Sequence, residues 1–74
     1  MSVKDRLRGA AKLVALEAEG RLWATPAEAA DVFERDLKSV YAALEHGDIP
    51  STRIGPRYQI AVAWLRRQAE GRTA

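Results

Sequence analysis

Hydrophobic residues recur at intervals of three and four along most of the chain, the spacing of one face of an α-helix. In the N-terminal segment, residues 1–22, this pattern predicts a helix over residues 2–20 that ends at Gly20. Its expected inner face consists of Val3, Leu7, Ala10, Val14 and Ala18, widened by Leu13 and Leu16. Such a helix either only covers the core or also presents a docking surface to a neighbouring subunit.

Residues 25–46 predict two helices joined by a very short connection. Thr25 and Glu28 form the spacing of a capping box, and Pro26 occupies the first helical position, where proline is well tolerated. This helix is expected to bury four apolar residues and to turn three carboxylates outward. The apolar residues are Ala29, Ala30, Val32 and Phe33, and the carboxylates are Glu28, Asp31 and Glu34.

The second helix of this pair begins and ends at clear signals. Asp36 is expected to cap its first turn, and Gly47 followed by Pro50 ends it. Its apolar face carries Leu37, Val40, Tyr41 and Leu44. Two helices with so short a connection indicate a helix-turn-helix, in which the second helix enters the major groove of DNA.

Residues 49–60 predict a β-hairpin. Ile54, Tyr58 and Ile60 share one face only if the turn has an odd number of residues. We therefore expect a three-residue turn, Gly55-Pro56-Arg57, with Arg57 at the tip and Arg53 on the outer face. A two-stranded ribbon is not stable alone, so it must pack on the helices.

Residues 61–72 predict a closing helix with Val62, Leu65 and Ala69 inside and Trp64 beside them. The predicted fold is mainly α with a small two-stranded β wing, a winged helix-turn-helix. At 74 residues it forms one domain, residues 1–74, which buries only about 60% of the surface of its unfolded chain. A large catalytic cavity is therefore not expected.

The composition excludes several kinds of site. There is no cysteine, so no disulfide or thiolate metal site can form. His46 is the only histidine, and the carboxylates of residues 28–34 are typical of a solvated helix face. No nucleophile and base pair can be named. We expect no enzymatic activity, no catalytic residue, no metal, no cofactor and no small-molecule substrate.

Charge is unevenly distributed along the chain, although the net charge is only +2. Residues 25–50 carry two basic and six acidic residues, whereas residues 51–74 carry five basic residues and one acidic residue. The basic hairpin and tail favour a nucleic-acid partner, and the acidic middle segment complicates that interpretation.

The candidate DNA-binding residues follow from this geometry. On the second helix of the pair they are Arg35, Lys38, Ser39, Tyr41 and Ala42. Tyr41 either packs in the core or reaches a phosphate. On the wing, Arg53 and Arg57 are candidates for a narrowed minor groove, where negative potential is concentrated. Arg66 and Arg67 are possible phosphate contacts or only partners of the helix dipole.

The run from Thr25 to Leu65 resembles the excisionase-type, MerR-like winged helix-turn-helix domain. The matching residues are Ala29-Ala30, Ser39-Val40-Tyr41, Gly47, Ile49-Pro50, Arg53-Ile54-Gly55, Arg57 and Leu65. The extra N-terminal helix and the Ala/Arg-rich composition most resemble excisionases of mycobacteriophages, also called recombination directionality factors.

The resemblance implies a protein that binds tandem sites at phage attachment DNA cooperatively and head-to-tail. It implies DNA bending that directs a tyrosine integrase toward prophage excision. The family's turn often has a glycine and an apolar residue where this chain has Glu34 and Arg35, and its recognition helix is commonly richer in arginine. Affinity should therefore rest on phosphate contacts and DNA shape more than on base edges.

Two alternatives remain open. A MerR-like transcriptional regulator of the same fold would bind a symmetric site as a dimer, and a protein-interaction module would not bind DNA. No run of 18 apolar residues and no signal-peptide core is present, so we expect no membrane partner and a cytoplasmic, nucleoid-associated protein in a bacterial host.

Overall fold

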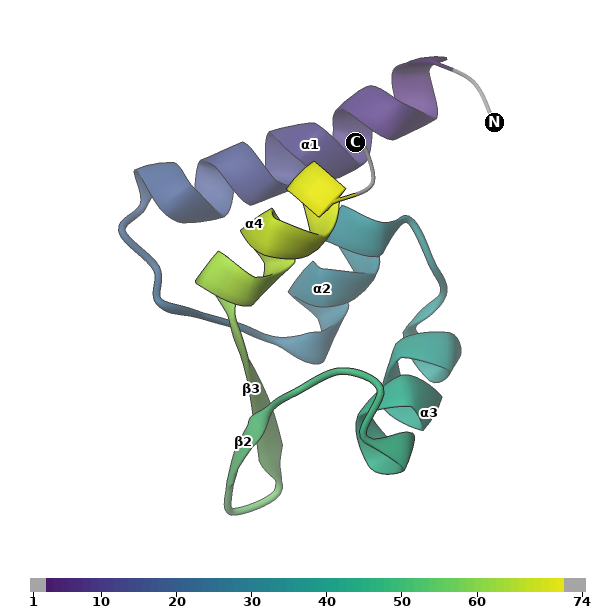
Figure 1. Cartoon of the computed structure of the whole chain (residues 1–74), viewed down its shortest axis with the longest axis vertical. Coiled ribbons are helices and arrows are strands. Elements are labelled where there is room, and N and C mark those ends of the chain that lie inside the picture. Colours follow the sequence, from purple (N-terminus) through teal and green to yellow (C-terminus); the bar gives the residue numbers. More distant parts are fainter. Residues whose placement is uncertain (1–2, 72–74) are drawn as a thin grey trace.

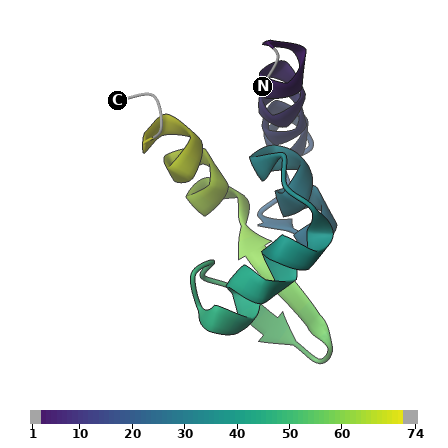
Figure 2. The same cartoon turned by 90° about the vertical axis from the view of Figure 1, so that its right-hand side faces the viewer.

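The computed structural model describes the backbone of residues 3–71 and the side chains of residues 9–71. This part of the chain is mainly helical, with a small antiparallel sheet. The helices are α1 (Val3–Ala18), α2 (Pro26–Phe33), α3 (Leu37–His46) and α4 (Val62–Gly71), and the strands are β1 (Trp23–Ala24), β2 (Thr52–Ile54) and β3 (Arg57–Ala61). Helix α1 lies across one end, whereas α3 and the β2–β3 hairpin lie together at the other (Figure 1 and Figure 2).

The predicted start of α2 and both predicted ends of α3 are confirmed, because they depend on local capping. Helix α1 ends at Ala18, two residues before the predicted end at Gly20. The Thr25 hydroxyl accepts the Glu28 N–H at 3.1 Å, and the Glu28 carboxylate accepts the Thr25 N–H at 2.9 Å. Asp36 accepts the Ser39 N–H at 3.1 Å and caps α3. Gly47 ends α3 with a φ of 81°, a left-handed conformation that glycine adopts without steric penalty.

The predicted inner face of α1 is correct for Leu13 and Leu16, which were expected to widen it, and wrong for Ala10, Val14 and Ala18. Leu13 and Leu16 are almost fully buried, whereas Val14 is 55% exposed and both Ala10 and Ala18 are exposed. The side chains of residues 3 and 7 lie outside the described part. Helix α1 has apolar residues on two faces, and the face with the larger leucines is the one packed on the other helices, since it removes more apolar surface from water.

The sheet has three strands in the order β1-β3-β2, rather than the two predicted. Trp23 and Ala24 pair with Ala61 and Ile60, which places β1 on the free edge of β3. Neither a two-residue strand nor its pairing with β3 is visible in the local sequence pattern. Strand β1 forms because the chain after α1 passes alongside β3.

The predicted three-residue turn is also wrong. Ile54 pairs with Arg57, so only Gly55 and Pro56 form the turn. Gly55 has a φ of 60°, and proline holds a negative φ, a combination that fits a type II′ hairpin turn. The even-numbered loop puts Arg53 on the same face as Tyr58 and Ile60, and puts Ile54 on the outer face, where it is 60% exposed.

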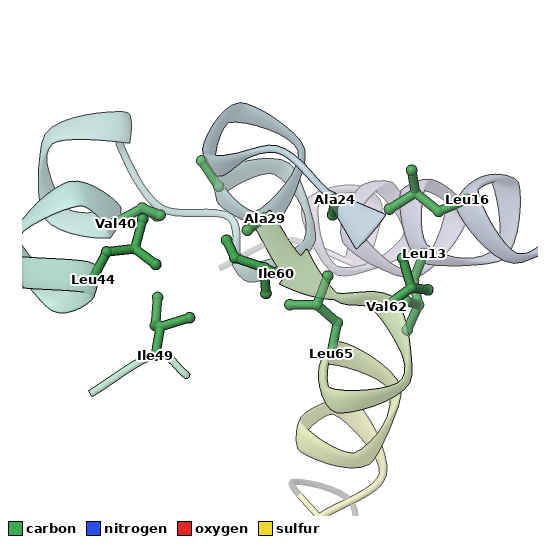
Figure 3. Packing of buried hydrophobic residues seen from close by; sticks show 11 residues of the cluster. Leu13, Leu16, Ala24, Ala29, Val40, Leu44, Ile49, Ile60, Val62 and Leu65 are labelled. Atoms are coloured by element: carbon green, nitrogen blue, oxygen red, sulfur yellow. The ribbon is translucent and has the colours of Figure 1, made fainter. Parts of the chain in front are cut away.

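One hydrophobic core connects all the helices and the sheet. It consists of Leu13, Leu16, Ala24, Ala29, Ala30, Val40, Leu44, Ile49, Ile60, Val62 and Leu65. Figure 3 shows Val40, Leu44 and Ile49 at one end of this cluster and Leu13 and Leu16 at the other. Ile60 of β3 is fully buried between them and connects the two ends. The predicted inner residues of α4, Val62 and Leu65, are confirmed.

Two arginine–glutamate pairs hold distant segments together. Arg66 of α4 donates to Glu17 of α1 through two guanidinium nitrogens, one of them at 2.9 Å. Arg21 donates to the Glu28 carboxylate at 2.6 and 2.9 Å, joining the segment before β1 to the first turn of α2. The hydrogen bonds from Arg66 and Arg21 lower the pKa of Glu17 and Glu28, respectively, below the usual value of 4.5.

The three carboxylates on and directly after α2 do not form the uniformly solvated face that was predicted. Asp31 is exposed, but Glu28 is bound by Arg21 and Glu34 is half-buried. Glu34 follows α2 in a left-handed conformation, with a φ of 57°. This is the position where the excisionase-type domains that the sequence resembles often have glycine. Its side chain packs beside Gly9 of α1.

Gly9→Ala tests the close approach of α1 and α2. A Cβ at Gly9 would lie 2.6 Å from the Val32 carbonyl oxygen, so the helices must move apart. Alanine stabilises a helix by about 1 kcal/mol relative to glycine. We nevertheless expect a net loss of about 1–3 kcal/mol in the free energy of unfolding, the usual range for overpacking. Urea denaturation of the variant and of wild type measures this loss. Gly71→Ala is the control, because a Cβ there meets no atom within 4 Å; equal effects of the two variants would contradict the close approach.

Stability should fall in acid through the Glu28 carboxylate. Because Arg21 lowers the pKa of Glu28 in the folded protein, its contribution is fully present above pH 4.5 and is lost as the pH falls through the folded pKa. Thermal unfolding from pH 7 to pH 2 should show Arg21→Gln less stable than wild type at neutral pH. The difference should shrink in acid; a difference independent of pH would show that the ion pair does not stabilise the fold.

Candidate nucleic-acid interface

Helix α3 presents an exposed face beside the hairpin. Lys38 and Ala42 of the predicted set lie on it, four residues apart, and both side chains are exposed. Glu45 follows three residues later and is also exposed, so it shares this face. The face therefore has a basic beginning and an acidic end, and phosphate contacts are favoured near the first turn of α3.

Ser39 and Arg35 lie elsewhere on this end of the molecule. The Ser39 hydroxyl donates to Asp36 at 2.7 Å, as part of the helix cap, and these hydrogen bonds lower the pKa of Asp36. A phosphate contact by Ser39 would have to replace that bond. Both residues line a groove on α3 together with Phe33, Val40, Ala43 and Ile49. The fold thus brings Arg35 and Ser39 together, whereas Tyr41 lines a different groove.

Three side chains connect α3 to the hairpin. The rings of Tyr41 and Tyr58 meet edge to face, with their centroids 6.1 Å apart. The Arg53 guanidinium carbon lies 4.9 Å from the centroid of the Tyr58 ring, a cation–π distance. Arg53 thus lies on the Tyr58 face of the hairpin rather than on the predicted outer face, because the turn has two residues. We call Tyr41, Tyr58 and Arg53 the aromatic bridge.

Tyr41 itself is 41% exposed, so it is neither a core residue nor free of packing. Its ring belongs to the aromatic bridge. It also lines a groove between α3, the hairpin tip and the start of α2, with Thr25, Pro26, Pro56, Arg57 and Tyr58. Arg57 is exposed in this groove, close to the tip as predicted, although it belongs to β3 rather than to the turn.

The two arginines predicted on the closing helix differ from one another. Arg66 is held by Glu17, so its guanidinium is occupied in joining α4 to α1. Arg67 is exposed and takes part in no ion pair among the described residues. Both lie on α4, whereas the other candidates lie on or beside α3 and the hairpin.

The acidic middle of the chain is partly neutralised from elsewhere in the fold. Arg21 binds Glu28, and Lys12 lies 4.0 Å from Asp31. By contrast, Arg35, Lys38, Arg53 and Arg57 take part in no ion pair within residues 9–71. Glu28 and Asp31 of α2 are therefore paired, while Arg35, Lys38 and the two hairpin arginines are available to an anionic partner.

Sequence reasoning missed the roles of Tyr58 and Ile54. Tyr58 was expected on the buried face; it is half-buried against the core and also joins the hairpin to α3. Ile54 was expected on the same face and is exposed. The available signal was Gly55 directly before Pro56, since glycine at the first central position is typical of a two-residue type II′ turn. That turn fixes which face each hairpin residue occupies.

Comparisons of the chain with protein-family models, with curated proteins and with solved structures return no match. Within the described residues, no group of three or more His, Asp or Glu side chains is placed to hold a metal ion. No helix in that part combines the length and apolar character needed to cross a membrane.

A double-mutant cycle tests the aromatic bridge. Tyr41→Ala and Tyr58→Ala should each destabilise the protein, and their combined loss should be smaller than the sum by about 0.5–1.5 kcal/mol, the usual value of an aromatic pair. Chemical denaturation of the four proteins measures this coupling. Tyr41→Ala with Trp64→Ala is the matched control, since Trp64 packs on Phe33 instead. Additive losses in both cycles would contradict the bridge.

Proposed function

We propose that this protein is a winged helix-turn-helix DNA-binding protein and acts as a phage excisionase. The observation that carries the DNA-binding part is the aromatic bridge, which holds the hairpin beside the exposed face of α3. In this arrangement α3 enters the major groove and the hairpin, as the wing, contacts the adjacent minor groove. Arg35 and Lys38 belong to the helix side, and Arg53 and Arg57 belong to the wing.

Charge supports this orientation. The four cations near α3 and the wing are not used in ion pairs of the described part, so contact with phosphates does not require breaking any. Arg21 and Arg66, by contrast, would have to leave their carboxylate partners, the half-buried Glu28 and the exposed Glu17. Glu45 lies near the end of α3 and disfavours deep insertion of that end. Binding therefore depends on phosphate contacts and on the shape of the DNA.

Subunit size supports binding in tandem. The molecule measures 36 × 26 × 21 Å, and its long axis runs from α1 to the end that carries α3 and the hairpin. The end that faces DNA is therefore no wider than 26 Å, which corresponds to roughly 8 base pairs at about 3.4 Å per pair. One subunit makes few phosphate contacts, and neighbouring copies along the DNA would supply the rest.

The excisionase assignment comes from the resemblance of Thr25 to Leu65 to excisionase-type domains. Under this proposal several copies bind head-to-tail beside an attachment site, bend the DNA and direct a tyrosine integrase toward excision. The partners are double-stranded DNA, further copies of this chain and the integrase. A contact of this kind between unlike surfaces continues along the DNA as an open filament.

A gel-shift titration with attachment-site DNA from the genetic element that encodes the protein tests this function. We expect a ladder of cooperative complexes on that DNA and not on a shuffled duplex. Arg57→Ala should weaken binding and reduce the slope of log affinity against log salt by about 0.9, the value for one phosphate contact. Arg57→Lys is the control for charge, and it should keep most of that slope.

The outcomes separate the two parts of the proposal. A single two-fold symmetric complex would favour a transcriptional regulator of the same fold. Equal affinity for attachment-site and shuffled DNA would remove the excisionase assignment and leave DNA binding. No binding of any duplex at physiological salt would contradict both, and would favour a protein-interaction module.

A further inference from the structure

The tip of the hairpin carries an apolar side chain that the fold does not use. Ile54 is 60% exposed on the outer face of the sheet, directly opposite Arg57 in the last pair before the turn. A Cβ at Gly55 would meet no atom within 4 Å, so the turn is open at that position. An isoleucine and an arginine are therefore neighbours at the free end of the hairpin.

The tip is well suited to enter a groove without losing much conformational freedom. The side chain of isoleucine is stiff at χ1, and the Gly55-Pro56 turn restricts the backbone between the two strands. The aromatic bridge braces the strands against α3, with Arg53 over the Tyr58 ring. The apolar tip is thus presented in a defined direction relative to the cations around it.

These features match a minor-groove wedge. Proteins that kink DNA insert apolar side chains such as isoleucine between base pairs in the minor groove, while arginines contact the narrowed groove. Steps of a pyrimidine followed by a purine unstack most easily. A polar tip would serve ordinary phosphate contact, so an exposed isoleucine directly opposite Arg57 calls for a different role.

We propose that Ile54 is a wedge that inserts between two base pairs of duplex DNA at a pyrimidine–purine step and kinks the duplex, with Arg57 beside it in the minor groove. This inference rests on the proposed DNA binding and names the residue that produces the bend. It does not depend on the excisionase assignment. Leu22 and Val14 are also exposed, at 76% and 55%, but neither belongs to the hairpin.

The experiment uses the full chain and a duplex selected by binding from a random-sequence library, so that no attachment site is needed. The probe is this duplex with 2-aminopurine in place of adenine at each TA and CA step of either strand in turn, and with a donor and an acceptor dye at its ends. Wild type should raise 2-aminopurine fluorescence at one step and bend the duplex by about 20–90°, the range for side-chain wedges.

Ile54→Ala should abolish the fluorescence increase and bring the bend below about 20°, while the salt dependence of binding stays as in wild type because no charge changes. Ile54→Leu should restore most of both signals. Leu22→Ala is the matched control and should behave as wild type. Thermal unfolding followed by circular dichroism checks that each variant is folded.

Two results would overturn the wedge and leave DNA binding intact. In one, wild type binds and no position gains fluorescence. In the other, Ile54→Ala loses the cooperative higher complexes but keeps the fluorescence and bend of the single-subunit complex, which would assign Ile54 to a contact between copies. If wild type binds no duplex selected from the library, both the wedge and the proposed DNA binding fail.

Discussion

Strand β3 is the element on which the rest of the structure depends, because both of its edges are hydrogen-bonded. It pairs with β1 on one side and β2 on the other, and the chain continues directly from it into α4. The Val62 N–H donates to the Leu22 carbonyl at 3.0 Å, which extends the pairing with the N-terminal segment to the start of α4. Ile60, at the centre of β3, is fully buried in the core. The core that supports α1 and the hairpin that lies beside α3 therefore share one strand.

That shared strand determines how the candidate interface is held. Tyr58 lies two residues before Ile60 and so projects from the same face of β3. From there its ring reaches Tyr41 of α3 on one side and Arg53 of β2 on the other. Side-chain packing thus joins α3 to the hairpin in addition to the loop between them, in which Ile49 is buried in the core.

Some charged side chains form ion pairs that support the fold, and others are left for a partner. Glu17 and Glu28 are bound by arginines that join α1 to α4 and the β1 segment to α2. The formal charge of a segment therefore says little about its surface: the acidic run of residues 25–50 contains Glu28, which is paired, and Asp36, which caps a helix. Arg35 and Lys38 lie in the same run and remain unpaired within the described residues.

The sequence by itself determined the start of α2, both ends of α3, the position of the hairpin and the exposure of Lys38, Ala42 and Arg57, because capping and periodicity act over three or four residues. Tertiary structure decided the remaining features. Strand β1 forms only beside β3. The buried face of α1 depends on the packing of Leu13 and Leu16. Because the Gly55-Pro56 turn has two residues, Arg53 lies on the inner face of the hairpin and Ile54 on the outer face, the reverse of what was expected. A change of one residue in a turn exchanges the two faces of a strand, and the aromatic bridge joins residues that only the folded chain brings together.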